Sequence, residues 1–271
     1  MNYRHAFHAG NFADLVKHAA LTLILRELTA APQPLTMIDT HGGAGVYDLD
    51  GEMAVRSGEA AAGIGQLMAD AGAPHALGPL KQAVARFNPG ELTRYPGSPV
   101  LAAGALRRGD RLITCEINPE DHDSLRRSLA KHPQAKVVKG DGYAVVREQA
   151  PTGRLVVLID PPFERPDDYE QASRALGAVL RRNPGATVVI WLPLKDLETF
   201  DAFLRSIEAP GALVVEARLR PLLDPMKMNG CALVIANPPP GLEGPLREAC
   251  RWVVETLGDP GEARLWRLGG A

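Results

Sequence analysis

Four consecutive residues, Asp160-Pro161-Pro162-Phe163, follow directly after the apolar run 155–159 and have the composition of a catalytic centre. In an open α/β sheet, ligands bind where parallel strands end, so a strand over 155–159 would deliver these residues to a site. The two prolines lack an N–H group and fix φ, which leaves carbonyl acceptors on a stiff backbone. A carboxylate and a carbonyl held in this way can accept both hydrogens of an exocyclic NH₂ group and turn its lone pair toward an electrophilic methyl group. The motif predicts methylation of an exocyclic amine, with Asp160 as the catalytic residue.

Phe163 completes this motif with an aromatic ring. The ring offers an apolar face on which an extruded base can stack, so Phe163 is a predicted substrate-binding residue. The alternative is a strand followed by a proline turn in which Asp160 only caps a helix. The motifs that follow three other strand-like runs of the sequence weigh against that alternative.

Three other motifs also follow apolar, strand-like runs. In residues 37–45, glycines at a strand-to-helix turn would let a cofactor approach the backbone, but their spacing lacks the full dinucleotide fingerprint and disfavours a nicotinamide cofactor. Glu116 ends a second run, where an acid commonly receives a ribose diol. Asp141, within Gly140-Asp141-Gly142, can accept from an adenine amino group. A solvated Glu116 and a simple turn at 140–142 are the alternatives.

Polar side chains gather near the beginning of the sequence: Tyr3, Arg4, His5, His8, Lys17 and His18. Their spacing shows neither an H-x₃-H pattern nor acidic partners, so no metal site is predicted. Lys17 and His18 interrupt the apolar pattern of a helix that begins near Asn11. They therefore either face a pocket or form an exposed pair.

Strand-like and helical patterns alternate along the chain. The expected strands are 35–38, 111–117, 135–138, 155–159, 187–192, 212–217 and 231–236. The expected helices are 11–28, 120–131, 169–182 and 194–207. Most of the strand-like runs are continuously apolar, as in strands that helices cover on both faces. The alternation predicts a doubly wound α/β sheet.

One interval is too long for this alternation. Roughly 65 residues separate the glycine turn from the strand at 111, whereas an ordinary βαβ unit takes about 30. Residues 50–95 contain helical patterns at 60–71 and 77–87, and we expect them to form a small inserted helical subdomain. The main domain would then comprise 1–49 and 96–271. The last dozen residues are expected to be a loose tail.

The composition of the chain argues against several classes of protein. The formal net charge of −2 argues against nonspecific coating of nucleic acid, which needs many phosphate contacts, but allows a local basic surface. Three scattered cysteines are too few for a disulfide framework or a zinc site, and Cys115 and Cys231 are expected to be buried thiols. No apolar segment resembles a secretory signal or a membrane span, so we expect a cytoplasmic protein without a membrane partner.

Together these motifs resemble the class I methyltransferases, and more closely the bacterial 23S rRNA (adenine-N6) methyltransferase family RlmJ. The similarity is most specific at residues 3–18, and further blocks lie at 39–45, 95–99, 141–142 and 160–162. The resemblance implies a Rossmann-like sheet of seven strands with a small helical subdomain inserted after the first strand. It also implies methylation, by S-adenosyl-L-methionine, of the 6-amino group of one adenine in 23S rRNA, at position 2030 in the reference rRNA.

The resemblance assigns roles to individual residues of this sequence. Those implied to line the S-adenosylmethionine site are His18, His41, Ser98, Glu116, Asp141, Gly142 and Asp160. Those implied to lie on the substrate side, with Phe163, are Tyr3, His5 and Lys17, within an N-terminal segment, 1–18, able to order over the base. No obligate protein partner is indicated.

One position departs from the family pattern, because the catalytic motif usually ends in Tyr and residue 163 is Phe. Stacking needs only the ring, so we expect activity to survive. Asp-Pro-Pro-Phe also resembles the motif of methyltransferases that act on the guanine 2-amino group. The alternatives are therefore an enzyme acting on rRNA guanine or DNA adenine, or a noncatalytic RNA-binding module that kept the fold.

Overall fold

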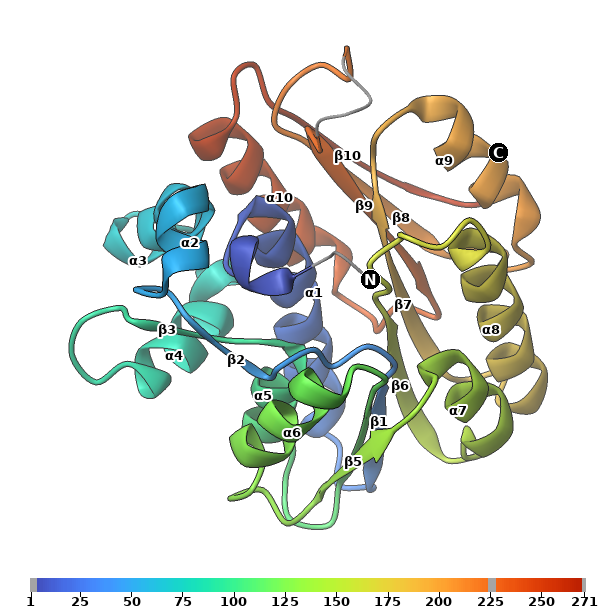
Figure 1. Cartoon of the computed structure of the whole chain (residues 1–271). Coiled ribbons are helices and arrows are strands. Elements are labelled where there is room, and N and C mark those ends of the chain that lie inside the picture. Colours follow the sequence, from blue (N-terminus) through green and yellow to red (C-terminus); the bar gives the residue numbers. More distant parts are fainter. Residues whose placement is uncertain (1–3, 224–227, 270–271) are drawn as a thin grey trace.

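A single mixed sheet forms the centre of the molecule (Figure 1), described here by a computed structural model that covers residues 4–223 and 228–269 of the chain. Within those residues the sheet has eight strands in the spatial order β10-β8-β9-β7-β6-β1-β4-β5. Their bounds are β1 Leu35–Asp39, β4 Arg111–Glu116, β5 Ala135–Lys139, β6 Arg154–Ile159, β7 Thr187–Pro193, β8 Leu213–Arg218, β9 Gly230–Ala236 and β10 Glu262–Arg267. The helices packed on it are α1 Phe12–Thr29, α5 Ser98–Ala105, α6 Pro119–Ser128, α7 Gly142–Gln149, α8 Asp168–Arg182, α9 Leu197–Ser206 and α10 Glu243–Leu257.

The parallel half of the sheet determines where ligands can bind. Strands β5, β4, β1, β6 and β7 pair in parallel, so their carboxyl ends lie along one edge. From β1 the chain proceeds outward to β4 and β5, and from β6 it proceeds in the opposite direction to β7. The order therefore reverses between β1 and β6, and such a switch point opens a crevice at the carboxyl ends.

The other half of the sheet is antiparallel, and with it the sheet has eight strands, one more than the seven expected. Strand β9 lies antiparallel between β7 and β8, and β10 pairs antiparallel with the outer edge of β8. The expectation of a loose tail after residue 259 was therefore wrong for Glu262–Arg267. Only Leu265 and Trp266 are large apolar residues in this edge strand, so its apolar signal is weak; Leu265 is nevertheless buried and Trp266 packs edge-on against Phe200.

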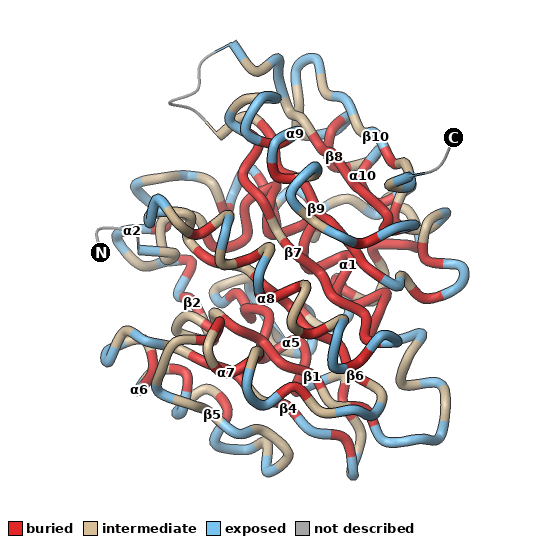
Figure 2. The backbone as a smooth tube through the Cα atoms, turned by 90° about the vertical axis from the view of Figure 1, so that its right-hand side faces the viewer, coloured by how far each residue is buried: buried red, intermediate tan, exposed pale blue. Residues whose placement is uncertain are grey.

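Helices cover both faces of the sheet, which explains the continuously apolar strands. Neighbouring residues along β6 belong to different cores, since Val156 and Leu158 pack with α1, α5 and α10, whereas Val157 and Ile159 pack with α7, α8 and α9. Figure 2 shows the central strands buried along most of their length. The seven expected strands and the four expected helices are confirmed within a few residues at each end.

Helix α1 is unusual because it buries charge. It begins after Asn11, whose side chain accepts a hydrogen bond from the backbone N–H of Asp14, as an N-cap should. Its residues are buried from Phe12 through Leu25, including Asp14, Lys17 and His18. The exposed Lys-His pair is thus excluded, and both side chains face the interior. Among the described helices, none combines the length and apolarity that crossing a bilayer requires.

Between β1 and α5 the chain leaves the main sheet. Its elements are β2 Val46–Asp48, α2 Glu52–Ser57, the π-helical η2 Ala61–Gly65, α3 Gln66–Ala69, the 3-10 turn η3 His75–Leu77, α4 Gly78–Phe87 and β3 Arg94–Pro96. Strands β2 and β3 form an antiparallel ribbon, and helix α4 packs on α1. The glycine turn leads into β2, and the expected strand-to-helix turn was wrong. Gly43 and Gly45 have φ of 59° and 80°, left-handed values that turn the chain into the ribbon.

Candidate active site

A cavity of about 770 Å³ opens at the carboxyl ends of β1, β4, β6 and β7. Its wall combines α1, the glycine turn after β1, residues 116–118 after β4, residues 160–164 after β6, and residues 51–54 of the segment that leaves the sheet. A volume of this size suits a cofactor-sized ligand. The cavity therefore lies at the crevice that the strand order predicts.

Most of the residues that the sequence singled out meet at this cavity. Those that line it are His5, Lys17, His18, His41, Ser98, Glu116, Asp160 and Phe163. Asp141 and Gly142 do not line it. Tyr3 lies outside the described residues.

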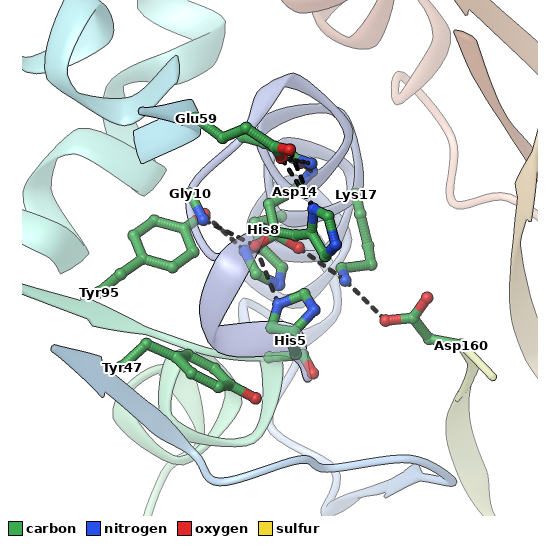
Figure 3. A network of polar contacts seen from close by, with 12 residues as sticks. His5, His8, Gly10, Asp14, Lys17, Tyr47, Glu59, Tyr95 and Asp160 are labelled. Carbon is green, nitrogen blue, oxygen red and sulfur yellow. Dashed lines mark hydrogen bonds and ion pairs between the residues drawn. The ribbon is translucent and has the colours of Figure 1, made fainter. Parts of the chain in front are cut away.

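Asp160 forms an ion pair on the cavity wall with a residue far away in the sequence. Its Oδ2 lies 2.6 Å from the Nζ of Lys17, which also contacts Oδ1 of Asp14 at 2.8 Å (Figure 3). The side chains of Lys17 and Asp14 are only 5% and 2% exposed, and that of Asp160 is 14% exposed. One ammonium thus bridges two carboxylates where β6 meets α1.

Burial and the neighbouring charges shift the pKa values of this cluster in opposite directions. Burial alone would lower the pKa of Lys17, but the carboxylates of Asp14 and Asp160 outweigh it and hold that pKa well above its usual value. Burial would likewise raise the pKa of Asp14, yet Lys17 and His5 hold it well below its usual value. Lys17 and Asp14 are therefore both charged at neutral pH, which fixes the ammonium beside Asp160.

The N-terminal segment 4–11 closes over this cluster through further polar contacts. Nε2 of His5 lies 3.2 Å from Oδ2 of Asp14, and the same oxygen accepts from the backbone N–H of Gly10 at 2.9 Å. His8 contacts the carboxylate of Glu59 at 3.0 Å, which joins the segment to the chain between α2 and η2 (Figure 3). The segment is thus tied both to α1 and to the chain between β1 and α5.

His18 faces the cavity with one nitrogen bonded and one unpaired. Its Nδ1 lies 2.7 Å from the hydroxyl of Tyr95, which is fully buried on β3. Among the described residues its buried Nε2 has no hydrogen-bond partner. Burial lowers the pKa of His18 to about 3, so the imidazole is neutral.

Acidic side chains terminate β1 and β4. The carboxylate of Glu116 accepts from the backbone N–H groups of Gly43 at 2.9 Å and Asn118 at 2.7 Å, which fixes it against the glycine turn. Burial raises its pKa. Asp39, fully buried, accepts from the hydroxyl of Ser98 at 2.7 Å, and burial raises its pKa to about 6 although Ser98 opposes the shift.

The structure also gives specific contacts for three further predicted residues, Asp141, Gly142 and Phe163. The carboxylate of Asp141 accepts from the N–H of Tyr143 and so caps α7, while Gly142 packs directly on the backbone of Thr40. Phe163 adopts φ of 49°, and its ring centroid lies 4.6 Å from that of Tyr169 and 6.0 Å from that of Trp191. Phe163 therefore belongs to a cluster of aromatic rings, of which Phe163 and Trp191 line the cavity.

Two residues of the site escaped the sequence analysis. Asp14 lies three positions before Lys17, and the i,i+3 spacing of opposite charges in an apolar helix could have revealed it. Tyr95 belonged to a recognised motif, but nothing in the sequence indicates that its hydroxyl reaches His18. The part of the chain that the structure describes holds no cluster of three or more His, Cys, Asp or Glu side chains placed for a metal ion.

These features define an α/β protein with a ligand cavity at the switch point of its sheet. A family model described as "Ribosomal RNA large subunit methyltransferase D, RlmJ" matches residues 32–268. The chain therefore belongs to this family of ribosomal RNA large subunit methyltransferases, which confirms the resemblance seen in the sequence motifs.

Individual relatives agree over nearly the whole chain. The ribosomal RNA large subunit methyltransferase J of Escherichia coli K12 is 33% identical over 263 residues, covering 95% of this chain and 94% of the relative. The protein of the same name from Haemophilus influenzae is 33% identical over 264 residues, with the same coverage. A crystal structure of a Legionella pneumophila protein superposes with a TM-score of 0.89 at 28% identity, covering 96% of this chain and 98% of that one.

Proposed function

We propose that the protein transfers a methyl group from S-adenosyl-L-methionine to the 6-amino group of an adenine in 23S rRNA. Family membership and the names of the two relatives support the reaction and the rRNA substrate. The observation that carries the proposal is the carboxylate of Asp160, held by Lys17 on the cavity wall where β6 ends. The same position is where the sequence motif places the acceptor of an exocyclic amine.

The residues of the cavity fit the proposed cofactor. The carboxylate of Glu116, fixed by two backbone N–H groups, retains lone pairs that suit a ribose diol. The unpaired Nε2 of His18, a cavity-lining residue on α1, supplies a buried polar atom. Ser98 and His41 complete the set that would hold the cofactor, with Asp141 and Gly142 as further predicted contacts. When bound, S-adenosylmethionine supplies an activated methyl group on a positively charged sulfur.

Asp160 would orient the target amine. Lys17 occupies its Oδ2, and no described residue donates to its Oδ1, which can therefore accept a hydrogen of the amine. The carbonyl of Pro161 would accept the second hydrogen. These two acceptors direct the nitrogen lone pair into the cavity, and most of the rate gain would come from this orientation. The amine loses its proton readily once the nitrogen carries a positive charge, so Asp160 need not act as a strong base.

Phe163 and the N-terminal segment would hold the extruded adenine. The ring of Phe163 is half-buried against Tyr169 and Trp191, which fixes its plane while leaving part of it on the cavity side. His5 and Lys17 also line the cavity. We further propose that residues 50–95 form an inserted helical subdomain and that 1–49 and 96–271 form the methyltransferase domain.

Transfer of labelled methyl groups to deproteinised 23S rRNA from a strain without this enzyme tests the function. We expect nucleoside mass spectrometry to detect N6-methyladenine in the rRNA. The Asp160→Asn variant, which keeps the size of the side chain, should lose at least about a hundredfold in rate. Asp201→Asn, which removes an exposed carboxylate on α9, is the matched control and should retain full activity.

Three outcomes would contradict the proposal. Label found only in DNA, or as 2-methylguanine, would replace the proposed substrate by one of the alternatives that Phe163 leaves open. A folded Asp160→Asn protein with more than a few per cent of activity would remove Asp160 from the catalytic role. Failure of the wild type to bind S-adenosylmethionine in calorimetry would revive the noncatalytic RNA-binding module.

A further inference from the structure

His18 is a neutral imidazole, so only one of its two nitrogens carries hydrogen. Burial lowers its pKa to about 3, with the neighbouring charge of Lys17 adding to the shift and that of Asp14 opposing it. The choice of nitrogen decides what Nε2 can offer a ligand, because this buried atom of a cavity-lining residue has no partner among the described residues. A donor there would attract an acceptor of the ligand, whereas an acceptor there would attract a ligand N–H group.

The hydroxyl of Tyr95 decides between these two forms. Tyr95 is fully buried, and burial holds its pKa well above the usual value, so the hydroxyl keeps its hydrogen. Within residues 4–223 and 228–269, Nδ1 of His18, at 2.7 Å, is the hydrogen-bond partner recorded for this hydroxyl. If Nδ1 carried the hydrogen, both the hydroxyl hydrogen of Tyr95 and the lone pair of Nε2 would be buried without a partner. With the hydrogen on Nε2, only that N–H lacks a partner, and it belongs to a residue that lines the cavity. The hydroxyl therefore donates to Nδ1, and the hydrogen of the imidazole lies on Nε2.

We propose that Tyr95 is a positioning residue, which holds His18 with its hydrogen on Nε2 so that His18 donates to the carboxylate of the cofactor's amino-acid end. This inference rests on the proposed function. Lys17, the neighbouring cation, is held between Asp14 and Asp160, so the imidazole supplies the donor on this part of α1. Glu116, which also lines the cavity, is an acceptor suited to hydroxyl groups, so a carboxylate matches the donor on α1 better.

Because Tyr95 lies in the segment 46–96, this segment helps to position a residue of the site. Tyr95 lies on β3, where the chain returns to the main sheet, and its ring centroid is 5.5 Å from that of His18. The hydrogen bond thus joins α1, which precedes β1, to the far end of the segment 46–96.

The tautomer can be measured without ligand by long-range ¹⁵N–¹H NMR of the histidine rings, with His18→Gln used to assign the signal. We expect the wild type to carry hydrogen on Nε2 and Tyr95→Phe to populate the Nδ1–H form. Tyr143→Phe is the matched control, because it removes the hydroxyl of another buried tyrosine, which bonds Asp168, and should leave the His18 signal unchanged. Hydrogen on Nδ1 in the wild type, or an unchanged signal in Tyr95→Phe, would overturn the positioning role.

Calorimetry then tests the carboxylate contact with two probes, S-adenosylhomocysteine and its decarboxylated analogue, which keeps the amine. We expect Tyr95→Phe and His18→Ala each to weaken S-adenosylhomocysteine about tenfold while binding of the analogue changes little. Equal losses for both probes would overturn the contact and indicate a general structural effect. Failure of the wild type to bind either probe would reject the proposed function, and the NMR result would still decide the role of Tyr95.

Discussion

At the scale of single residues, the site depends on a lysine that is buried between two acids. Asp14 and Asp160 come from the first turn of α1 and from the end of β6, and Lys17, whose side chain is only 5% exposed, neutralises part of their charge. A buried ion pair of this kind adds little net stability compared with apolar residues, but removing one partner leaves an uncompensated charge. The cluster therefore fixes the position of Asp160 more than it stabilises the fold.

This arrangement predicts the effect of Lys17→Met, which keeps most of the side-chain volume and removes the charge. We expect the free energy of unfolding to fall by about 3–5 kcal/mol, because two buried carboxylates lose their cation. Methyl transfer should fall at least about tenfold, because Asp160 loses the donor that orients it. Urea unfolding and single-turnover kinetics measure the two effects. Adding Asp14→Asn should recover part of the stability, and no recovery would show that lost packing is responsible.

At the scale of elements, the carboxyl ends of parallel strands bring together residues that are far apart in the sequence. The end of β1 also receives α7, because Gly142 at the start of this helix packs on the backbone of Thr40. A side chain at position 142 would overlap the carbonyl of Thr40, which is buried and cannot move away. The glycine of this motif is thus explained by packing between α7 and β1.

Gly142→Ala should therefore separate α7 from the end of β1. We expect a loss of about 1–3 kcal/mol in the free energy of unfolding, as for other substitutions that overfill a packed contact. Gly140→Ala is the matched control two residues away, because a Cβ there meets nothing within 4 Å, and its unfolding free energy should stay close to that of the wild type. Equal stability of the two variants in urea unfolding would contradict this account of Gly142.

The strands also differ in how well the sequence predicts them. Strands such as β6 and β9 were predicted because burial on both faces makes every residue apolar, which is a strong local signal. Strand β10 was missed because an edge strand with one neighbour needs few apolar residues. The meeting of Glu116 and Asp160 could be predicted from strand ends alone. The contacts of Asp14 and Tyr95 could not, because they depend on how α1 and β3 pack.

At the scale of the whole molecule, three parts of the chain that lie far apart in sequence enclose the cavity. The main sheet provides Asp160 and Glu116, the segment 46–96 provides Tyr47, and the N-terminal segment 4–11 lies against both. His8 and Glu59 join the last two, with Asn11 donating a second hydrogen bond to Glu59 at 2.9 Å. One of the contacts that hold the N-terminal segment over the site is thus an ion pair that is itself more than a third exposed.

This ion pair should make stability depend on pH in a defined direction. The hydrogen bond to Glu59 raises the pKa of His8 above 6.5, so the pair contributes below pH 6.5 and loses its contribution as the pH rises through the raised pKa. Glu59→Gln should lower the free energy of unfolding by at most about 1 kcal/mol at pH 6, given the exposure of the pair, and by less at pH 9. Glu91→Gln, an exposed glutamate on the loop before β3, is the control. Urea unfolding at both pH values measures the difference, and a gap that widens toward pH 9 would show that His8 does not hold the segment through its charge.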